Sequence, residues 1–517
     1  MTNKIYLLIL AVFSISINQY FGNRGVFPID SFLIFDSAYN IISGNHPFRD
    51  YWLITGPFLD YFQSLFFIIF GVNWFSYVLH ASFLNMALTL FSFYFFINIG
   101  LKKIYSFIYS LGVAVLAYPA IGVPFIDHHS FIFSIMAIYS ISLAILYNKK
   151  LFWFLTPLFL IFSFFSKQIP SSYLLIPFAI VILIYYFSLT NKDKNFLKYI
   201  LSGILFSTIL IIVVFFVNEI PVNNFLIQYI FYPSSLGANR INSLNIDFDN
   251  TIGQFKFIYF ALIPLMIITI ILFKKNKNNI IKSKELIISL FFLTSIFIFI
   301  YCQLLTKNQV LIFSLIPISL AFSHTYIQKF LNKKYFTYFV LLIFVIAISK
   351  YHLRFNHNKK FMELSNANFE KAISPKNLDR RLFGLKWITP DYINAPTNEI
   401  DLLVEVKKNL INVEENKIIV TDYQFFSSLL LNEIASPNKW YDELSTPSKD
   451  NKYYTNYKNF FLEKLKINQV KYIYFIGKNK HNTDFFDDLI YLNKCIISRN
   501  INELLVEFNI SKCKEIL

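Results

Sequence analysis

The chain has few charged residues, and acidic residues are fewer than basic ones. Of its 517 residues 15% are charged, 31 are Asp or Glu, and 56% are hydrophobic. The mean hydropathy is +0.50. A soluble globular domain carries about 25% charged residues, so this composition excludes the soluble class and indicates a polytopic membrane protein.

Several common signatures are also missing. The sequence has no Walker loop, no Gly-x-Ser-x-Gly and no His-Glu-x-x-His, which disfavours an ATP-driven pump and the usual hydrolase sites. The net charge of +16 comes from short Lys clusters between apolar runs, so we expect no nucleic-acid partner. No small-x-small cleavage site follows the first apolar run, which predicts an uncleaved first span.

What the chain does have is long apolar runs. A span needs about 20 mostly apolar residues, and we count about eleven runs of that kind. The predicted spans are 4–21, 74–100, 104–122, 129–147, 151–166, 171–189, 197–217, 256–273, 286–305, 309–326 and 335–350.

Lysine clusters indicate the orientation. They follow alternate spans and fall on the side that holds Lys4, which the positive-inside rule makes the cytoplasm. We therefore predict an α-helical membrane domain, 1–350, in the cytoplasmic (inner) membrane. Its first outer loop is 22–73, its second long outer loop is 218–255, and residues 351–517 lie in the periplasm or outside the cell.

The tail, 351–517, changes character. Charged residues become frequent, β-rich runs at 417–420 and 470–475 alternate with helical patterns at 399–410, 425–431 and 456–465, and a small α/β domain is predicted. We interpret it as a lid or an acceptor-docking domain; a structural appendage is the alternative. Cys495 and Cys513, two of only three cysteines, bracket its expected last helix, and we predict a disulfide between them.

The stretch 30–71 does not resemble an ordinary loop. Apolar residues recur at helical spacing over 32–42 and 58–70, so two amphipathic helices are predicted, with Asp30, Asp36, Asp50 and Asp60 in the same stretch. The pattern resembles the first extracytoplasmic loop of the GT-C superfamily of membrane glycosyltransferases, which includes protein mannosyltransferases and lipid A aminoarabinose transferases. The matching residues are Asp30, then Gly44, Pro47, Phe48, Arg49 and Asp50, then Gly56-Pro57.

The resemblance implies that Asp30 is the catalytic carboxylate, which would act as a general base. Asp36 is a candidate second acid, although the family often has Asp-Glu where this chain has Asp30-Ser31, which gives little support for a second acid or a metal. The alternative for Asp30 is a helix N-cap. Asp127, His128 and His129 are interpreted, with Arg49 and Asp50, as a polar cluster at a cavity mouth rather than as metal ligands; for Asp127 a helix cap is the alternative. No cofactor is predicted, and a divalent metal is left open.

Three cations are candidates for binding a donor phosphate. Arg240 lies in the long outer loop and can hold two oxygens with its planar fork. Lys167 stands alone on the outer side, where snorkelling to the interface is the alternative, and Lys307 is the third candidate. His80, within a span, is interpreted as a satisfied core histidine.

These features favour an inverting glycosyltransferase. It would transfer a sugar from a polyprenyl-phosphate donor to a hydroxyl of a glycan, lipid or protein acceptor at the outer face, because a leaving phosphate needs cations and no partner acid. The rival hypothesis is a secondary transporter or flippase of envelope precursors. We find no internal repeat of the kind that transporters show.

Overall fold

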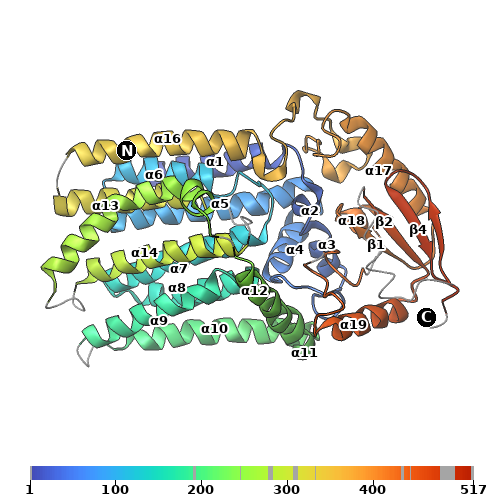
Figure 1. The fold of residues 1–517 in the computed structure, drawn as a ribbon, viewed down its shortest axis with the longest axis horizontal. Helices are drawn as coiled ribbons and strands as arrows, with labels where there is room; N and C mark the ends of the chain where they lie inside the picture. Colours follow the sequence, from blue (N-terminus) through green and yellow to red (C-terminus); the bar gives the residue numbers. More distant parts are fainter. Residues whose placement is uncertain are drawn as a thin grey trace.

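The computed structural model describes residues 3–189, 194–244, 246–277, 283–306, 312–331, 334–431, 436–442, 444–477 and 495–513. It has a bundle of long helices at one end and a smaller unit with a four-stranded sheet at the other (Figure 1). The N-terminus lies at the end of the bundle that is far from the sheet.

Within the described ranges, eight helices are long and apolar enough to cross a membrane. Each contains an apolar window of 18 residues with at most two charged side chains, and such a segment is close to the length that a bilayer core requires. The chain is therefore an integral membrane protein. The eight coincide with predicted spans and are α1 (Asn3–Gly22), α5 (Trp74–Asn98), α7 (Ile126–Tyr147), α9 (Ser171–Ser188), α10 (Phe196–Val217), α13 (Gln254–Lys275), α14 (Lys284–Leu305) and α16 (Lys334–Tyr351).

The other three predicted spans coincide with shorter helices. These are α6 (Lys103–Leu116), α8 (Lys150–Ser166) and α15 (Leu315–Tyr326), with 14, 17 and 12 residues. The predicted span 104–122 is too long because Tyr118 precedes Pro119, and a residue before proline is biased away from helical geometry.

Lysine-rich turns meet at the end of the bundle that is far from the sheet. Lys284 donates to the carbonyl of Leu146 over 3.1 Å, and the Tyr147 hydroxyl donates to the carbonyl of Asn98. These contacts join the C-terminal ends of α5 and α7 to the start of α14. The clusters at 102–103 and 149–150 therefore share one end with Lys284.

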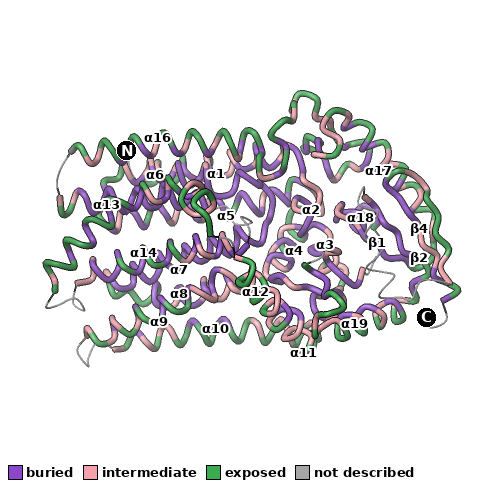
Figure 2. Tube along the Cα trace, viewed as in Figure 1, coloured by how far each residue is buried: buried purple, intermediate pink, exposed green. Residues whose placement is uncertain are grey.

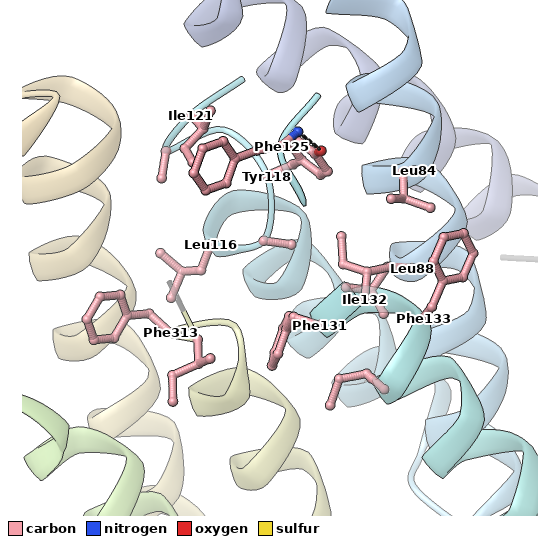
Figure 3. Packing of buried hydrophobic residues seen from close by; sticks show 14 of the residues in the cluster. Leu84, Leu88, Leu116, Tyr118, Ile121, Phe125, Phe131, Ile132, Phe133 and Phe313 are labelled. Atoms are coloured by element: carbon pink, nitrogen blue, oxygen red, sulfur yellow. Dashed lines mark hydrogen bonds between the residues drawn. The ribbon is translucent and has the colours of Figure 1, made fainter. Parts of the chain in front are cut away.

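Helix α7 is the centre of the bundle and α10 is at its edge. In the apolar window of α7 89% of the residues are buried, against 11% in α10, and Figure 2 shows the same contrast. Around α7, Leu84 and Leu88 of α5, Leu116 of α6 and Phe313 pack on Phe131 and Ile132 (Figure 3). The polar side chains at the start of α7 are thus held by a rigid, close-packed core.

The first loop forms a layer between the bundle and the sheet (Figure 1). It contains α2 (Pro28–Ser31), α3 (Phe35–Ile42) and α4 (Phe58–Phe70), so the two helices predicted in this loop are confirmed. Gly56 lets the loop approach the end of α8, because a Cβ at this position would lie 1.8 Å from the carbonyl oxygen of Phe165.

The C-terminal unit is a mixed four-stranded sheet with helices. The strands are β1 (Lys417–Thr421), β2 (Tyr472–Ile476), β3 (Ile497–Asn500) and β4 (Leu505–Asn509), in the order β1-β2-β4-β3. β1 and β2 are parallel and the other pairs are antiparallel. The two predicted strands and three predicted helices are confirmed as β1, β2, α17 (Pro396–Ile411), α18 (Phe426–Leu430) and α19 (Tyr454–Ile467).

The prediction of a helix between Cys495 and Cys513 is wrong. The segment forms the β3–β4 pair, in which Val506 and Phe508 lie opposite Phe475 and Ile473 of β2. A partner strand already in place favours the extended conformation over the weak helical preference of this short run. Cys495 and Cys513 form a disulfide across this segment.

Candidate functional site

A cavity of about 890 Å³ opens where the bundle, the first loop and the C-terminal unit meet. Its size is within the range of small-molecule sites, roughly 300–1,000 Å³. Four of the predicted site residues line it together, although they are far apart in the sequence: Asp30, Asp127, Lys167 and Arg240.

Asp30 reaches the cavity from the short helix α2. Pro28 begins this helix and the Ser31 hydroxyl accepts the Phe27 N–H over 2.9 Å. The N-cap position is Phe27, so the alternative that Asp30 caps a helix is wrong. Upstream, Gly25 and Val26 donate their N–H groups to carbonyls of Lys386 and Ile388, so the C-terminal unit holds the loop that carries Asp30.

The Asp30 carboxylate has no hydrogen bond or ion pair with any described residue. Burial raises its pKa to about 7, and the charge of Asp127 adds to this rise. Lys167 acts in the opposite direction, while Asp442 and Asp422 raise the pKa further. A carboxyl group with a pKa near 7 is suited to accept a proton at neutral pH.

Asp127 and Lys167 form a pair at the cavity wall. The Lys167 ammonium lies 2.6 Å from the Asp127 carboxylate, and the side chains are 12% and 2% exposed. Asp127 lies in the first turn of α7, whose N-cap is Phe125, so the alternative that Asp127 caps this helix is wrong. Lys167 follows the last residue of α8, and its backbone carbonyl accepts the Ser130 hydroxyl. Because each ion neutralises the other, neither is a free charge in the cavity.

Arg240 comes from the predicted long outer loop, which is mostly helical. The loop contains α11 (Val222–Phe225), a π-helix (Leu226–Phe231) and α12 (Tyr232–Asn242), and Arg240 is in the last turn of α12. Its positive charge acts on the Asp127 carboxyl, and no described residue forms an ion pair with it. The cavity therefore presents a guanidinium that is available to an anion.

The C-terminal unit completes the wall with Trp440, Asp442, Leu444 and Ser445. Sequence reasoning missed these residues, because they follow no recognisable spacing and are 410 or more positions from Asp30 in the chain. They are held close by two backbone bonds: Trp52 donates to Pro437 over 2.9 Å and Lys439 donates to Trp52 over 3.2 Å. An ion pair between Lys439 and Asp60, 2.5 Å long, was also missed.

Other predicted site residues have structural partners away from the cavity. Asp36 accepts the N–H groups of Ser427 and Ser428 and the Ser427 hydroxyl, so it joins α3 to α18. Burial raises the pKa of Asp36 to about 6, and these hydrogen bonds oppose the rise. Arg49 pairs with Asp50 over 2.7 Å and donates to the carbonyl of Asn218.

The histidines form a buried chain inside the bundle. His129 lies 2.8 Å from His80 between ring nitrogens and 2.7 Å from the Tyr118 hydroxyl, and His80 contacts the Gln63 carbonyl oxygen. His80 is thus a satisfied core residue, as predicted. His128 is buried against Tyr118 and Phe125. The structure does not bring His128 and His129 to the cavity wall, and Lys307 lies outside the described residues.

No group of three or more His, Cys, Asp or Glu side chains in the described part of the chain is arranged to hold a metal ion. No protein-family model matches the sequence, and a search of curated proteins finds no match. The interpretation of the cavity therefore depends on its own chemistry.

Proposed function

We propose that the protein is an inverting glycosyltransferase of GT-C type, which transfers a sugar from a polyprenyl-phosphate donor to an acceptor hydroxyl. One observation carries the proposal: an unpaired carboxylate, Asp30, and an unpaired guanidinium, Arg240, face the same large cavity in the part of the chain that the structure describes. The likeness of the 30–71 stretch to the first GT-C loop supports the same function.

The reaction needs one base and one cation. Asp30 takes the proton of the acceptor hydroxyl, whose oxygen then forms a bond to the anomeric carbon. The bond between that carbon and the phosphate oxygen breaks, and the phosphate leaves with the electron pair. Arg240 stabilises the developing negative charge with its planar fork. Asp127 is a weaker candidate for the base, because Lys167 lies 2.6 Å from its carboxylate.

In this proposal the bundle crosses the membrane eleven times, with α6, α8 and α15 beside the eight long helices. The lysine-rich end lies in the cytoplasm, and the cavity and the C-terminal unit lie at the outer face. A reporter fused after Leu517 tests the orientation. Activity only of a cytoplasmic reporter would overturn it.

The transporter hypothesis is less well supported. A transporter site is expected near the bilayer midplane, whereas this cavity lies at the junction with the C-terminal unit, and Trp440, Asp442, Leu444 and Ser445 of that unit line it.

The function is tested first with the gene deleted and restored. Mass spectrometry of envelope glycans should show a sugar that is lost on deletion and restored by the parent gene. Asp30→Asn should fail to restore it, because the amide accepts no proton. Asp36→Asn is the matched control, since Asp36 is also partly buried but lies outside the cavity. This variant should restore the sugar to the extent that the protein folds.

The purified protein gives the sharper test. With a polyprenyl-phosphate donor, Asp30→Asn should reduce turnover by about 10²–10⁴-fold, the usual contribution of a positioned base. Arg240→Gln should weaken donor binding, and Arg240→Lys should restore part of it. Parental turnover in folded Asp30→Asn protein would refute the assignment of the base.

A further inference from the structure

Three buried polar atoms that belong to residues of the cavity wall have no hydrogen-bond partner among the described residues. They are the Thr55 hydroxyl, the Trp440 indole N–H and the Ser445 hydroxyl. A buried donor without a partner costs about 1–3 kcal/mol, so such groups are rare in folded proteins. These three belong to residues of one cavity wall, where a ligand or bound water can satisfy them.

The three groups differ in character from the rest of the cavity. They are uncharged, and one is on an aromatic ring, whereas Arg240 from α12 brings positive charge. Asp442 lies beside them and accepts the Ser445 N–H over 2.6 Å, and it too lines the cavity. We call Thr55, Trp440, Asp442 and Ser445 the hydroxyl wall.

The hydroxyl wall is held firmly. Lys439, next to Trp440, forms the buried pair with Asp60 of α4, and its N–H donates to Trp52. Thr55 precedes Gly56, whose N–H donates to the Ser166 carbonyl over 3.1 Å. Pre-formed polar groups of this kind orient a ligand at low entropic expense.

Resting on the proposed function, we propose that the hydroxyl wall binds the acceptor and that the acceptor is a carbohydrate. Each sugar hydroxyl both donates and accepts hydrogen bonds, so the several hydroxyls of one sugar can together pair with the two wall hydroxyls, the indole N–H and the Asp442 carboxylate. The Trp440 ring adds an apolar surface for the C–H face of a sugar.

A peptide acceptor fits the wall less well. Extended peptides are held by backbone groups of a strand edge, and the lining residues come from helices and loops, with none from the described strands β1 to β4. The volume of about 890 Å³ has room for a donor headgroup and a further sugar.

The test uses the full-length protein in lipid nanodiscs and a panel of methyl glycosides of common hexoses, pentoses and amino sugars. Isothermal titration should detect saturable binding of at least one glycoside. Ser445→Ala and Thr55→Val should each weaken it by about 3–10-fold, the loss expected for one neutral hydrogen bond. Trp440→Phe keeps a ring and removes the N–H, and should act in the same direction.

Ser172→Ala is the matched control. Ser172 lines the same cavity, but its hydroxyl already donates to the Gln168 carbonyl over 2.5 Å, so this variant should bind glycosides like the parent protein. Absence of binding by every glycoside would overturn the inference. Equal binding by parent, Ser445→Ala and Thr55→Val would do the same, as would saturable binding of acetylated Ser or Thr tripeptides in place of glycosides.

A parallel measurement separates this inference from the proposed function. Release of sugar from the polyprenyl-phosphate donor depends on Asp30 and Arg240. If the parent protein releases sugar and the variants of the hydroxyl wall bind glycosides as tightly as the parent does, only the acceptor inference fails. If glycosides bind through the wall and no polyprenyl-phosphate donor is ever used, the proposed function fails while the carbohydrate site stands.

Discussion

The pair between Lys439 and Asp60 offers a prediction that is independent of function. The Lys439 ammonium lies 2.5 Å from Asp60, and the side chains are 3% and 0% exposed. The carboxylate also accepts the Ser37 hydroxyl at 2.8 Å and the Tyr51 hydroxyl at 3.2 Å. Burial lowers the pKa of Lys439, and Asp60 acts in the opposite direction.

Removing one partner should destabilise the junction strongly. Lys439→Met leaves a buried carboxylate with two hydroxyl donors, and Asp60→Asn leaves a buried ammonium facing an amide. Breaking a buried pair from one side costs about 3–5 kcal/mol, whereas apolar or neutral replacement of both partners is often close to neutral. The double variant should therefore be more stable than either single variant, so the coupling energy should exceed about 3 kcal/mol, the smallest loss expected for one single variant.

The measurement is the apparent melting temperature in nanodiscs at one fixed heating rate, because unfolding of such a protein is often irreversible. A change of 3–5 kcal/mol corresponds to a fall of about 6–20 °C for a unit of 150–250 residues. Lys464→Met is the control, since its contact with Asp50 is 3.9 Å long and partly exposed. Additive losses in the double variant would refute the view that the two charges stabilise each other.

Other predictions follow from single features of the structure. The rate of transfer should fall about tenfold per pH unit below pH 7, because burial raises the pKa of Asp30 to about 7 and the protonated acid cannot act as a base; a pH profile checks this. Replacing Cys495 and Cys513 by Ser should lower the stability of the C-terminal unit by about 2–4 kcal/mol, since the pair closes a loop of 18 residues; peptide mapping without reductant should find the disulfide in the parent. Asp36→Ala should hasten proteolysis near α18, because three hydrogen bonds to Ser427 and Ser428 are lost.

Hydropathy and local residue patterns are sufficient to predict most of the helices and two of the strands. All eight long apolar helices coincide with predicted spans, because a bilayer sets their length. The β-branched and aromatic residues of the runs at 417–420 and 470–475, bounded by polar turns, are sufficient to predict these strands. The β3–β4 segment was assigned wrongly, since a short apolar run does not distinguish strand from helix and its partner strand lies far away in the sequence.

The sequence is sufficient to predict which charged residues form the site. It is not sufficient to predict which of them form an ion pair. Asp30 is recognisable because a carboxylate near the membrane is costly, Lys167 because it breaks the positive-inside pattern, and Arg240 because its planar fork can hold two phosphate oxygens. That Lys167 neutralises Asp127, 40 positions away, depends on how α7 packs on α8. Thr55, Trp440 and Ser445 gave no signal, because ordinary neutral residues become informative only when the fold buries them without partners.

The ion pair between Asp127 and Lys167 also affects the pKa of Asp30, which leads to a last prediction. Asp127 raises the pKa of Asp30 more than Lys167 lowers it, so the intact pair holds the pKa of Asp30 above the value that burial alone would produce. Removing both charges with Asp127→Asn and Lys167→Met should lower the pH below which the transfer rate falls; this falling part of the pH profile is its acid limb. Lys167→Met alone leaves the Asp127 carboxylate unopposed and should move it to higher pH.

The comparison of the two variants is internally controlled, because both lack the Lys167 ammonium and differ only at Asp127. The measurement is the pH dependence of transfer at saturating donor, with folding checked by apparent melting temperature. If both variants shift this pH dependence in the same direction, the titrating group is not Asp30 as placed between Asp127 and Lys167. If the folded double variant transfers no sugar while Lys167→Met does, Asp127 becomes the better candidate for the base.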